Sequence, residues 1–218
     1  MSSNPVAERR RGGFLNREYI TTRFYARGTI SKAFVFKHRA IDGTRIYEGF
    51  ITVDDNLRPN QVRVVADEEK VKNLEVGERV KITGTFRSSN TIDQDSLTTH
   101  LLIYLYAIRI EKTDSRHEDF TEIYIRGNIC QIDKIRPMRY SEEWEFSYDY
   151  RIDFKIKGKN GERTFIAPCR AFNDLAKQIE VMKLGMNVCI RGEWCCRRYP
   201  ASDGTMKTTY EIVVRELL

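Results

Sequence analysis

Side chains that could act in catalysis are few and widely separated in this sequence. No H-x-x-x-H or G-x-x-x-x-G-K-[ST] motif occurs, and no cysteine has a histidine near it in the chain. Acidic clusters such as Asp54-Asp55 and Asp67-Glu68-Glu69 could hold a metal ion in a nuclease, although most such clusters lie in solvated loops. We therefore expect no catalytic activity, no cofactor and no metal site. The three histidines are His38, His100 and His117.

The cysteines also argue against metal or disulfide chemistry. Their number is odd, all of them lie in the second half of the chain, and none shows the C-x-x-C spacing of zinc ligands. We expect reduced thiols in strands. Because successive side chains of a strand point to opposite faces, one of Cys195 and Cys196 should be core and the other exposed. The remaining cysteines are Cys130, Cys169 and Cys189.

Aromatic and basic side chains on one face of a strand could bind a nucleic acid. A single strand is held by a positive groove along its phosphates and by rings on which its bases stack. Alternation places Arg191, Arg197 and Tyr199 on one face of a predicted strand. Tyr199 is either a stacking ring or an exposed tyrosine at a strand end. Trp194 falls on the opposite face with Val188, Ile190 and Gly192, so we expect it in the core.

The same combination recurs in the first half of the chain. Lys81 and Arg87 should point outward from a strand whose other face carries Val80, Ile82, Gly84 and Phe86. Upstream, an Asp42-Gly43 turn joins two strands into a basic and aromatic hairpin. This hairpin is either a DNA contact or a core segment with a solvated turn. Its residues are Phe34, Phe36, Lys37, Arg39, Arg45 and Tyr47.

The longest alternation runs from Trp144 to Ile156, with apolar side chains at the even positions. Period two over this length predicts a strand longer than a small barrel needs. We expect its second half in the core and its first half projecting as an apolar arm. The arm could contact bases, or it could pack on the other half of the chain or on a second chain. The projecting residues would be Trp144, Phe146, Tyr148 and Tyr150, with Met138, Arg139 and Tyr140.

Two copies of one β-rich unit must position these residues. The segment Arg27 to Ile30 is echoed by Arg126 to Ile129, and Val80 to Phe86 by Val188 to Trp194. The offsets, 126 − 27 = 99 and 192 − 84 = 108 residues, describe a unit of domain size rather than a solenoid repeat. We divide the chain into a basic arm (1–19), a first unit (20–111), a linker (112–120) and a second unit (121–218).

Each unit has the pattern of five strands with one helix before the fourth. This is the order of the OB-fold, a small Greek-key barrel that binds oligonucleotides. The sequence therefore predicts an all-β fold with minor helix, made of two tandem OB-fold barrels. We expect strands in the first unit at Phe24–Phe36, Tyr47–Val53, Val62–Ala66, Arg79–Phe86 and Leu101–Glu111, and helices at Asp67–Leu74 and Phe172–Leu184.

The charge balance favours an anionic partner. The 37 basic and 31 acidic residues give a net charge of +6, with a pI near 9.0. No apolar run approaches the roughly 20 residues that span a bilayer, and the first residues lack the hydrophobic segment of a signal peptide. We expect a cytoplasmic, nucleoid-associated protein without membrane contact.

Three segments of the second unit have the order and spacing of a known family. They run from Cys169 to Ala176, from Leu184 to Gly192 and from Thr208 to Val214. Together they resemble the bacterial single-stranded DNA-binding protein family, in the form that carries two OB domains per chain and dimerises. Such proteins usually end in an acidic tail that recruits partners. This sequence ends at Leu218 without one, so we do not expect recruitment of that kind.

The resemblance also implies particular binding residues. In the family, basic residues and a stacking aromatic precede an acidic-glycine turn, and the matching positions here are Arg197, Arg198 and Tyr199 before Asp203-Gly204. A further stacking aromatic falls on Phe172, whose alternative interpretation is a core residue at a helix entry.

The sequence thus predicts a non-catalytic protein that coats single-stranded DNA with little sequence preference in replication, recombination or repair. We expect a homodimer with four barrels, with other replication proteins as further candidate partners. A primosome-like replication adaptor that uses one barrel to bind protein, and a binder of structured RNA, remain alternatives. The predicted DNA-binding residues are Phe34, Phe36, Lys37, Arg39, Tyr47, Lys81, Arg87, Arg139, Tyr140, Trp144, Tyr148, Phe172, Arg191, Arg197, Arg198, Tyr199 and Lys207.

Overall fold

The computed structural model describes most of the chain as β-strands. The described residues are 21–54, 59–92, 99–114, 118–132, 136–137, 146–158, 161–200 and 204–218. The first half contains β1 (Thr22–Arg39), β2 (Arg45–Asp54), β3 (Pro59–Asp67), α1 (Glu68–Val71), β4 (Arg79–Ile92) and β5 (Thr99–Lys112). The second half contains β6 (Phe120–Ile132), β7 (Arg136–Pro137), β8 (Phe146–Gly158), β9 (Gly161–Phe172), α2 (Asn173–Glu180), β10 (Asn187–Pro200) and β11 (Met206–Leu217).

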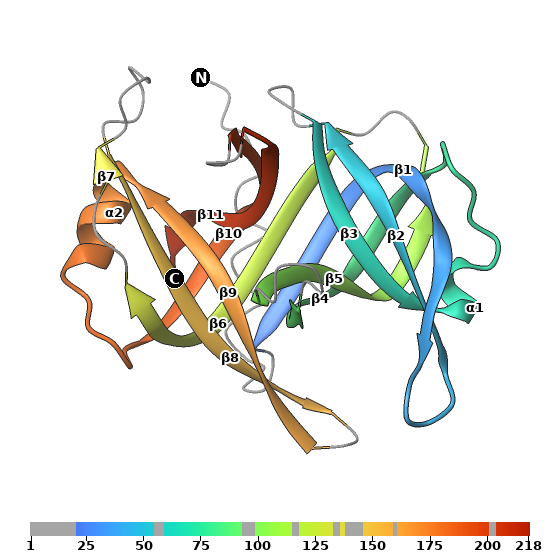
Figure 1. The fold of residues 1–218 in the computed structure, drawn as a ribbon, viewed down its shortest axis with the longest axis horizontal. Helices are drawn as coiled ribbons and strands as arrows, with labels where there is room; N and C mark the ends of the chain where they lie inside the picture. Colours follow the sequence, from blue (N-terminus) through green and yellow to red (C-terminus); the bar gives the residue numbers. More distant parts are fainter. Residues whose placement is uncertain are drawn as a thin grey trace, which may run out of the picture.

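The strands form two closed barrels that share one continuous sheet (Figure 1). The strand order is β2-β3-β5-β4-β1-β6-β10-β11-β9-β8-β7, and the added pairings β1–β2 and β6–β8 close the first and second barrels. Each barrel has its helix between its third and fourth long strands. This is the order of the OB-fold, and the predicted pair of tandem OB barrels is confirmed.

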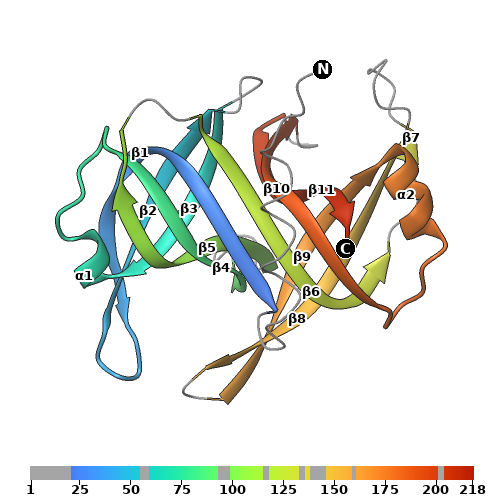
Figure 2. The same ribbon diagram turned by 180° about the vertical axis from the view of Figure 1, so that it is seen from behind.

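The barrels are joined through their first strands (Figure 2). β1 and β6 pair antiparallel, with Phe24 opposite Ile123 and Tyr25 opposite Glu122. The sequence repeat reappears in the hydrogen bonds beside this joint. The backbone N–H of Phe86 donates to Thr22 Oγ1 at 3.2 Å, and the N–H of Trp194 donates to Thr121 Oγ1 at 2.9 Å. The two barrels are therefore related by an approximate twofold axis that passes between β1 and β6.

Trp194 lies in the core, as predicted, at the contact between the barrels. Its ring centroid is 5.7 Å from that of Phe24 and 6.4 Å from that of Phe86. Its indole N–H donates to the backbone oxygen of Gln61 on β3 at 2.9 Å. An indole whose apolar body and N–H are both satisfied across a contact holds the two sides in one arrangement.

Polar groups complete the contact between the barrels. The buried Ser88 hydroxyl on β4 accepts a hydrogen bond from the N–H of Ile166 on β9 at 2.8 Å. The buried Asn60 on β3 accepts one from the N–H of Cys196 on β10 at 3.0 Å. The third strand of each barrel thus touches the fourth strand of the other.

Both helices are shorter than predicted and lie at opposite ends of the molecule (Figure 1). α1 is a single turn. Asp67, the residue before it, makes no capping hydrogen bond, and its carboxylate binds Lys70 and the hydroxyl of Tyr106 instead. After each helix a glycine with positive φ, Gly77 or Gly185, donates its N–H back to the first strand. These hydrogen bonds tie the loop that follows each helix to the first strand of its barrel.

The predicted arm in the long strand is wrong for the part that the structure describes. Tyr148 and Tyr150 are only 8% and 1% exposed, and both belong to the core. They are buried because β9 is as long as this stretch of β8 and pairs with it throughout, with Tyr148 opposite Ala171 and Tyr150 opposite Cys169. α2 packs on both strands at this end. Arg139, Tyr140 and Trp144 lie outside the described residues.

The cysteines all lie in strands and all are free thiols. The predicted contrast between Cys195 and Cys196 is wrong, because both side chains are half-buried. Cys196 lies where β3 touches β10, and Cys195 pairs with Glu211, which is buried in an ion-pair network. Both faces of β10 are covered at this point. Among the described residues, no helix is long and apolar enough to cross a membrane.

The hydroxyls of Thr22 and Thr121 should each contribute measurably to stability. A Thr22→Val substitution keeps the side-chain shape but leaves the Phe86 N–H without its partner in a buried site, which should lower the free energy of unfolding by about 1–3 kcal/mol. Thr121→Val should have a similar effect. Urea unfolding measures both.

The matched control is Thr91→Val, whose hydroxyl donates to the carbonyl of His100 on an exposed edge. Its cost should stay within about 0.5 kcal/mol. Equal stability of all three variants would contradict the role given to the hydroxyls of Thr22 and Thr121.

Candidate nucleic-acid interface

An aromatic platform covers the outer face of the first barrel. It consists of Phe50 on β2 with Tyr104 and Tyr106 on β5, whose side chains alternate with the core residues Ile103 and Leu105. β3 lies between the two strands and pairs with both. The face built by the second and third strands is the one on which OB-folds bind oligonucleotides.

Cations surround the platform. The Nζ of Lys32 lies 4.9 Å from the ring centroid of Phe50, and the guanidinium of Arg63 lies 5.2 Å from the same ring. Arg87 on β4 is placed over Tyr106 at 3.7 Å. These distances are those of cation–π contacts. Each cation comes from a strand next to the ring that it contacts, so the alternation of ring and charge follows from strand pairing.

The two tyrosines of the platform are neutral at physiological pH. Burial raises the pKa of Tyr106 to about 12, helped by the hydrogen bond that its hydroxyl donates to Asp67 at 2.7 Å. Burial also raises the pKa of Tyr104. Neutral phenols do not repel phosphates, so the rings can act as stacking surfaces.

The second barrel adds a charged rim to this platform. Arg163 on β9 lies close enough to Arg87 that its charge helps to lower the Arg87 pKa, although burial is the main cause. The Arg87 guanidinium also lies 6.0 Å from the Phe165 ring of β9. Arginine nevertheless remains charged in proteins. The rim therefore concentrates positive charge where β4 and β9 meet.

The predicted basic and aromatic hairpin between β1 and β2 is formed and extends away from the first barrel (Figure 1). Phe36 is 48% exposed and contacts Tyr47 edge to face, with ring centroids 6.0 Å apart. Arg45 lies over both rings, at 5.3 and 5.6 Å. Lys37 forms an ion pair with Glu48, and the Arg39 guanidinium donates to the carbonyl of Gly43 at 3.4 Å.

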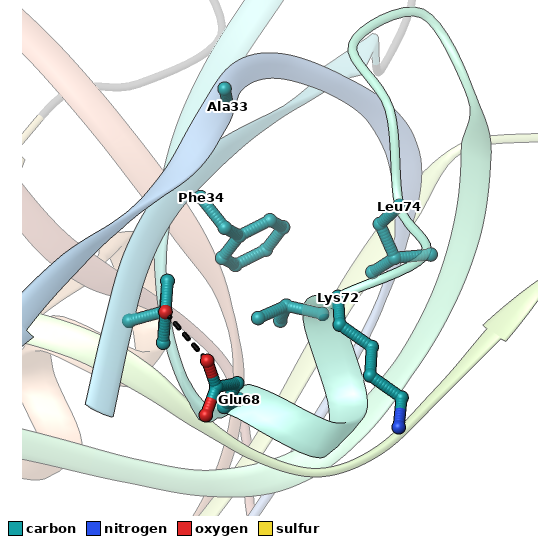
Figure 3. A pocket seen from close by; sticks show the side chains of 7 residues that line it. Ala33, Phe34, Glu68, Lys72 and Leu74 are labelled. Atoms are coloured by element: carbon teal, nitrogen blue, oxygen red, sulfur yellow. Dashed lines mark hydrogen bonds between the residues drawn. The ribbon is translucent and has the colours of Figure 1, made fainter. Parts of the chain in front are cut away.

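An open pocket of about 320 Å³ lies between the base of this hairpin and α1 (Figure 3). The Phe34 ring forms part of its wall and packs so closely on Gly49 that a Cβ there would be 2.8 Å from the ring. Tyr47 donates its hydroxyl to Glu68 Oε1 at 2.9 Å. Phe34 and Tyr47 are thus part core and part pocket lining, rather than free stacking rings.

The other predicted residues that the structure describes lie away from the platform. Arg191 pairs with Glu216 at 3.0 Å and with Glu122 at 3.6 Å, and Arg197 pairs with Glu211 at 3.5 Å. Arg198 and Lys81 are exposed, on β10 and on the end of β4 away from the platform. Phe172 is half-buried at the start of α2.

Only part of the predicted set can be placed on a surface. Tyr148 is core, so its prediction as a DNA contact is wrong. The side chains of Tyr199 and Lys207 lie outside the described part of the structure, although their backbones pair across β10 and β11. The roles predicted for the remaining residues stay predictions. Of the predicted set, Arg87 alone belongs to the platform and its rim as defined here.

The sequence contains a signal for part of the platform. Ile103, Leu105 and Ala107 alternate with Tyr104 and Tyr106, which marks two adjacent outward rings on one strand. Alternation alone does not show that Phe50 lies on the same face, because that depends on how β2, β3 and β5 pair. The rim residue Arg163 comes from the other barrel and has no signal in the local sequence.

No family model matches the sequence, and no curated protein matches it. Among solved structures, the single-stranded DNA binding protein from Thermus aquaticus matches with a TM-score of 0.65 and 13% identity, over 90% of this chain and 91% of that one. A deletion mutant of the same protein gives the same score over 93% of its chain. The N-terminal domain of PriB protein from Thermoanaerobacter tencongensis covers 44% of this chain at a TM-score of 0.36 and 19% identity.

At this level of identity the likeness concerns the fold. It extends over both barrels and their joint, because it covers 90% of the chain. The chain therefore has the tandem OB fold seen in the single-stranded DNA binding protein from Thermus aquaticus.

Proposed function

We propose that this protein binds single-stranded DNA on the aromatic platform of its first barrel. The observation that carries the proposal is the joint presence of three outward rings on the OB face formed by β2, β3 and β5 and of four cations around them, from β1, β3, β4 and β9. The tandem fold shared with a solved single-stranded DNA binding protein supports the same function. Only unstacked bases can reach such rings, so duplex DNA should bind much more weakly.

The cation–π contacts of the free protein do not prevent stacking. An exposed contact of this kind contributes about 0.5–1 kcal/mol. A base stacked on an aromatic ring contributes about 1–3 kcal/mol. Lys32 can therefore exchange the Phe50 ring for a phosphate when a base arrives, whereas Arg63 is also paired with Glu48 at 3.1 Å. Every base has a π-face, so this mode gives little sequence preference.

We further propose that the protein acts by binding alone and coats single strands in replication, recombination or repair. The platform offers rings and cations but contains no nucleophile next to a base. We place this activity in the cytoplasm at the nucleoid. We also propose that two copies associate into a homodimer with four barrels.

Titration with labelled dT oligomers of increasing length tests the central proposal. We expect binding that strengthens with length, with duplex DNA and hairpin RNA as weak competitors. If the four cations neutralise four phosphates, log Kd against log salt should have a slope of magnitude about 3, at roughly 0.7 per phosphate on a single strand. Fluorescence anisotropy at several salt concentrations gives both quantities. Absence of binding at any length would overturn the function and favour a protein-binding adaptor.

Arg163→Ala should reduce the salt slope by about 0.7 and weaken binding, because one rim cation is lost. Arg109→Ala is the control: it removes an exposed arginine, paired with Glu111, from the end of β5 away from the platform. Its slope and affinity should match those of the unmodified protein. Equal effects of the two variants would show that only overall charge matters.

Light scattering after size exclusion measures the oligomeric state. We expect a mass of twice 25.6 kDa, the mass of one chain. A mass of one chain at micromolar concentration would contradict the proposed dimer without affecting the platform.

A further inference from the structure

The two barrels can be compared position by position, because their backbones make the same close contacts. A Cβ on Gly28 would lie 2.3 Å from the carbonyl oxygen of Thr52, and one on Gly127 would lie 2.2 Å from that of Asp153. Thr52 and Asp153 therefore occupy equivalent positions on β2 and β8. Two residues earlier on the same face, Phe50 of the first barrel corresponds to Arg151 of the second.

Strand pairing gives the other equivalences. Arg87 lies opposite Tyr104, and Cys195 lies opposite Glu211. In the parallel pairs, Val65 is matched with Tyr106 and Arg170 with Val213. The second barrel therefore has Glu211 where the first has Tyr104, Val213 where it has Tyr106, and Cys195 where it has Arg87. None of the three platform rings has an aromatic counterpart.

A closed ion-pair network occupies the corresponding face of the second barrel. Arg170 is buried and its guanidinium makes two hydrogen bonds to Asp149, at 2.6 and 3.0 Å. Its third nitrogen lies 3.0 Å from Glu211, whose other oxygen lies 3.5 Å from Arg197. Such bidentate geometry fixes both groups. The charges of Arg170, Asp149, Glu211 and Arg197 are thus already paired within the protein.

This face lacks what a single strand needs. Its carboxylates would oppose phosphates, and breaking a buried pair to free Arg170 would leave an uncompensated charge. Removing one partner from such a pair is strongly unfavourable. On the first barrel, Lys32 gives up a ring contact, and Arg63 pairs with Glu48 through a single contact of 3.1 Å. Phe172, two residues after Arg170 on β9 and half-buried, lies on this face, but its position corresponds to Asp67 of the first barrel and not to a platform ring.

We infer that the two barrels are unequal: the first barrel holds the single strand on its platform, whereas the outer face of the second does not bind it. The second barrel contributes to the site only at the rim, through Arg163 and Phe165. This inference rests on the proposed function and assigns it to one barrel. One chain therefore covers the length of a single OB site, about 4–16 nucleotides, rather than two.

Substitutions at the equivalent positions Phe50 and Arg151 test the inference in the full chain. Phe50→Ala removes a ring without changing charge and should raise the Kd for a dT oligomer between about fivefold and a hundredfold. Arg151→Ala removes an exposed cation from the second barrel and should change it less than about twofold. Because loss of charge alone would weaken DNA binding, this order of effects is the reverse of what overall electrostatics predicts.

Thermal melting of each variant checks that it is folded, and Phe50→Leu, which keeps an apolar side chain but lacks the ring, replaces Phe50→Ala if that variant melts early. Equal or greater weakening by Arg151→Ala would overturn the inference, as would unchanged binding in both variants. If the unmodified protein binds no oligomer, the proposed function fails as well, so the two failures are distinguishable.

Discussion

The pairing of β1 with β6 is the interaction on which the rest of the structure depends. It joins two barrels into one sheet and sets the approximate twofold axis that brings β4 against β9 and β3 against β10. Trp194 then fills the space between the barrels and is tied to β3 by its indole N–H. Without this pairing Arg163 would not lie beside the platform, because it reaches the first barrel only through the contact of β9 with β4.

The internal repeat is kept where side chains face the joint and the cores, and lost where they face outward. Thr22 and Thr121 accept equivalent hydrogen bonds, and Gly28 and Gly127 allow equivalent close approaches of a neighbouring strand. On the outer faces the equivalent positions carry Phe50 and Arg151, which differ in both shape and charge. The requirements of the fold act on the first set of positions. The outer positions are not constrained by packing, so their side chains can differ according to what each face binds.

The sequence was sufficient to predict what depends on local periodicity. Alternation placed Trp194 in the core, and the repeated glycine segments predicted two barrels. Alternation could not show how far β9 extends beside β8, so Tyr148 was predicted to project although the strand pairing buries it. The platform was missed for a related reason. Its rings and rim come from β2, β5 and β9, and only the pairing of the strands shows that they share one surface.

Carrying both barrels in one chain frees them from a constraint that identical subunits obey. In a symmetric dimer of single barrels, every substitution appears twice, once on each side of the axis. A network such as that of Arg170 could then arise only if both binding faces acquired it together. Here the axis is approximate and the two halves are separate stretches of sequence. One barrel can therefore lose its DNA-binding face while the other barrel retains it. The approximate twofold axis between β1 and β6 thus provides the stability of a dimer joint without its obligatory symmetry.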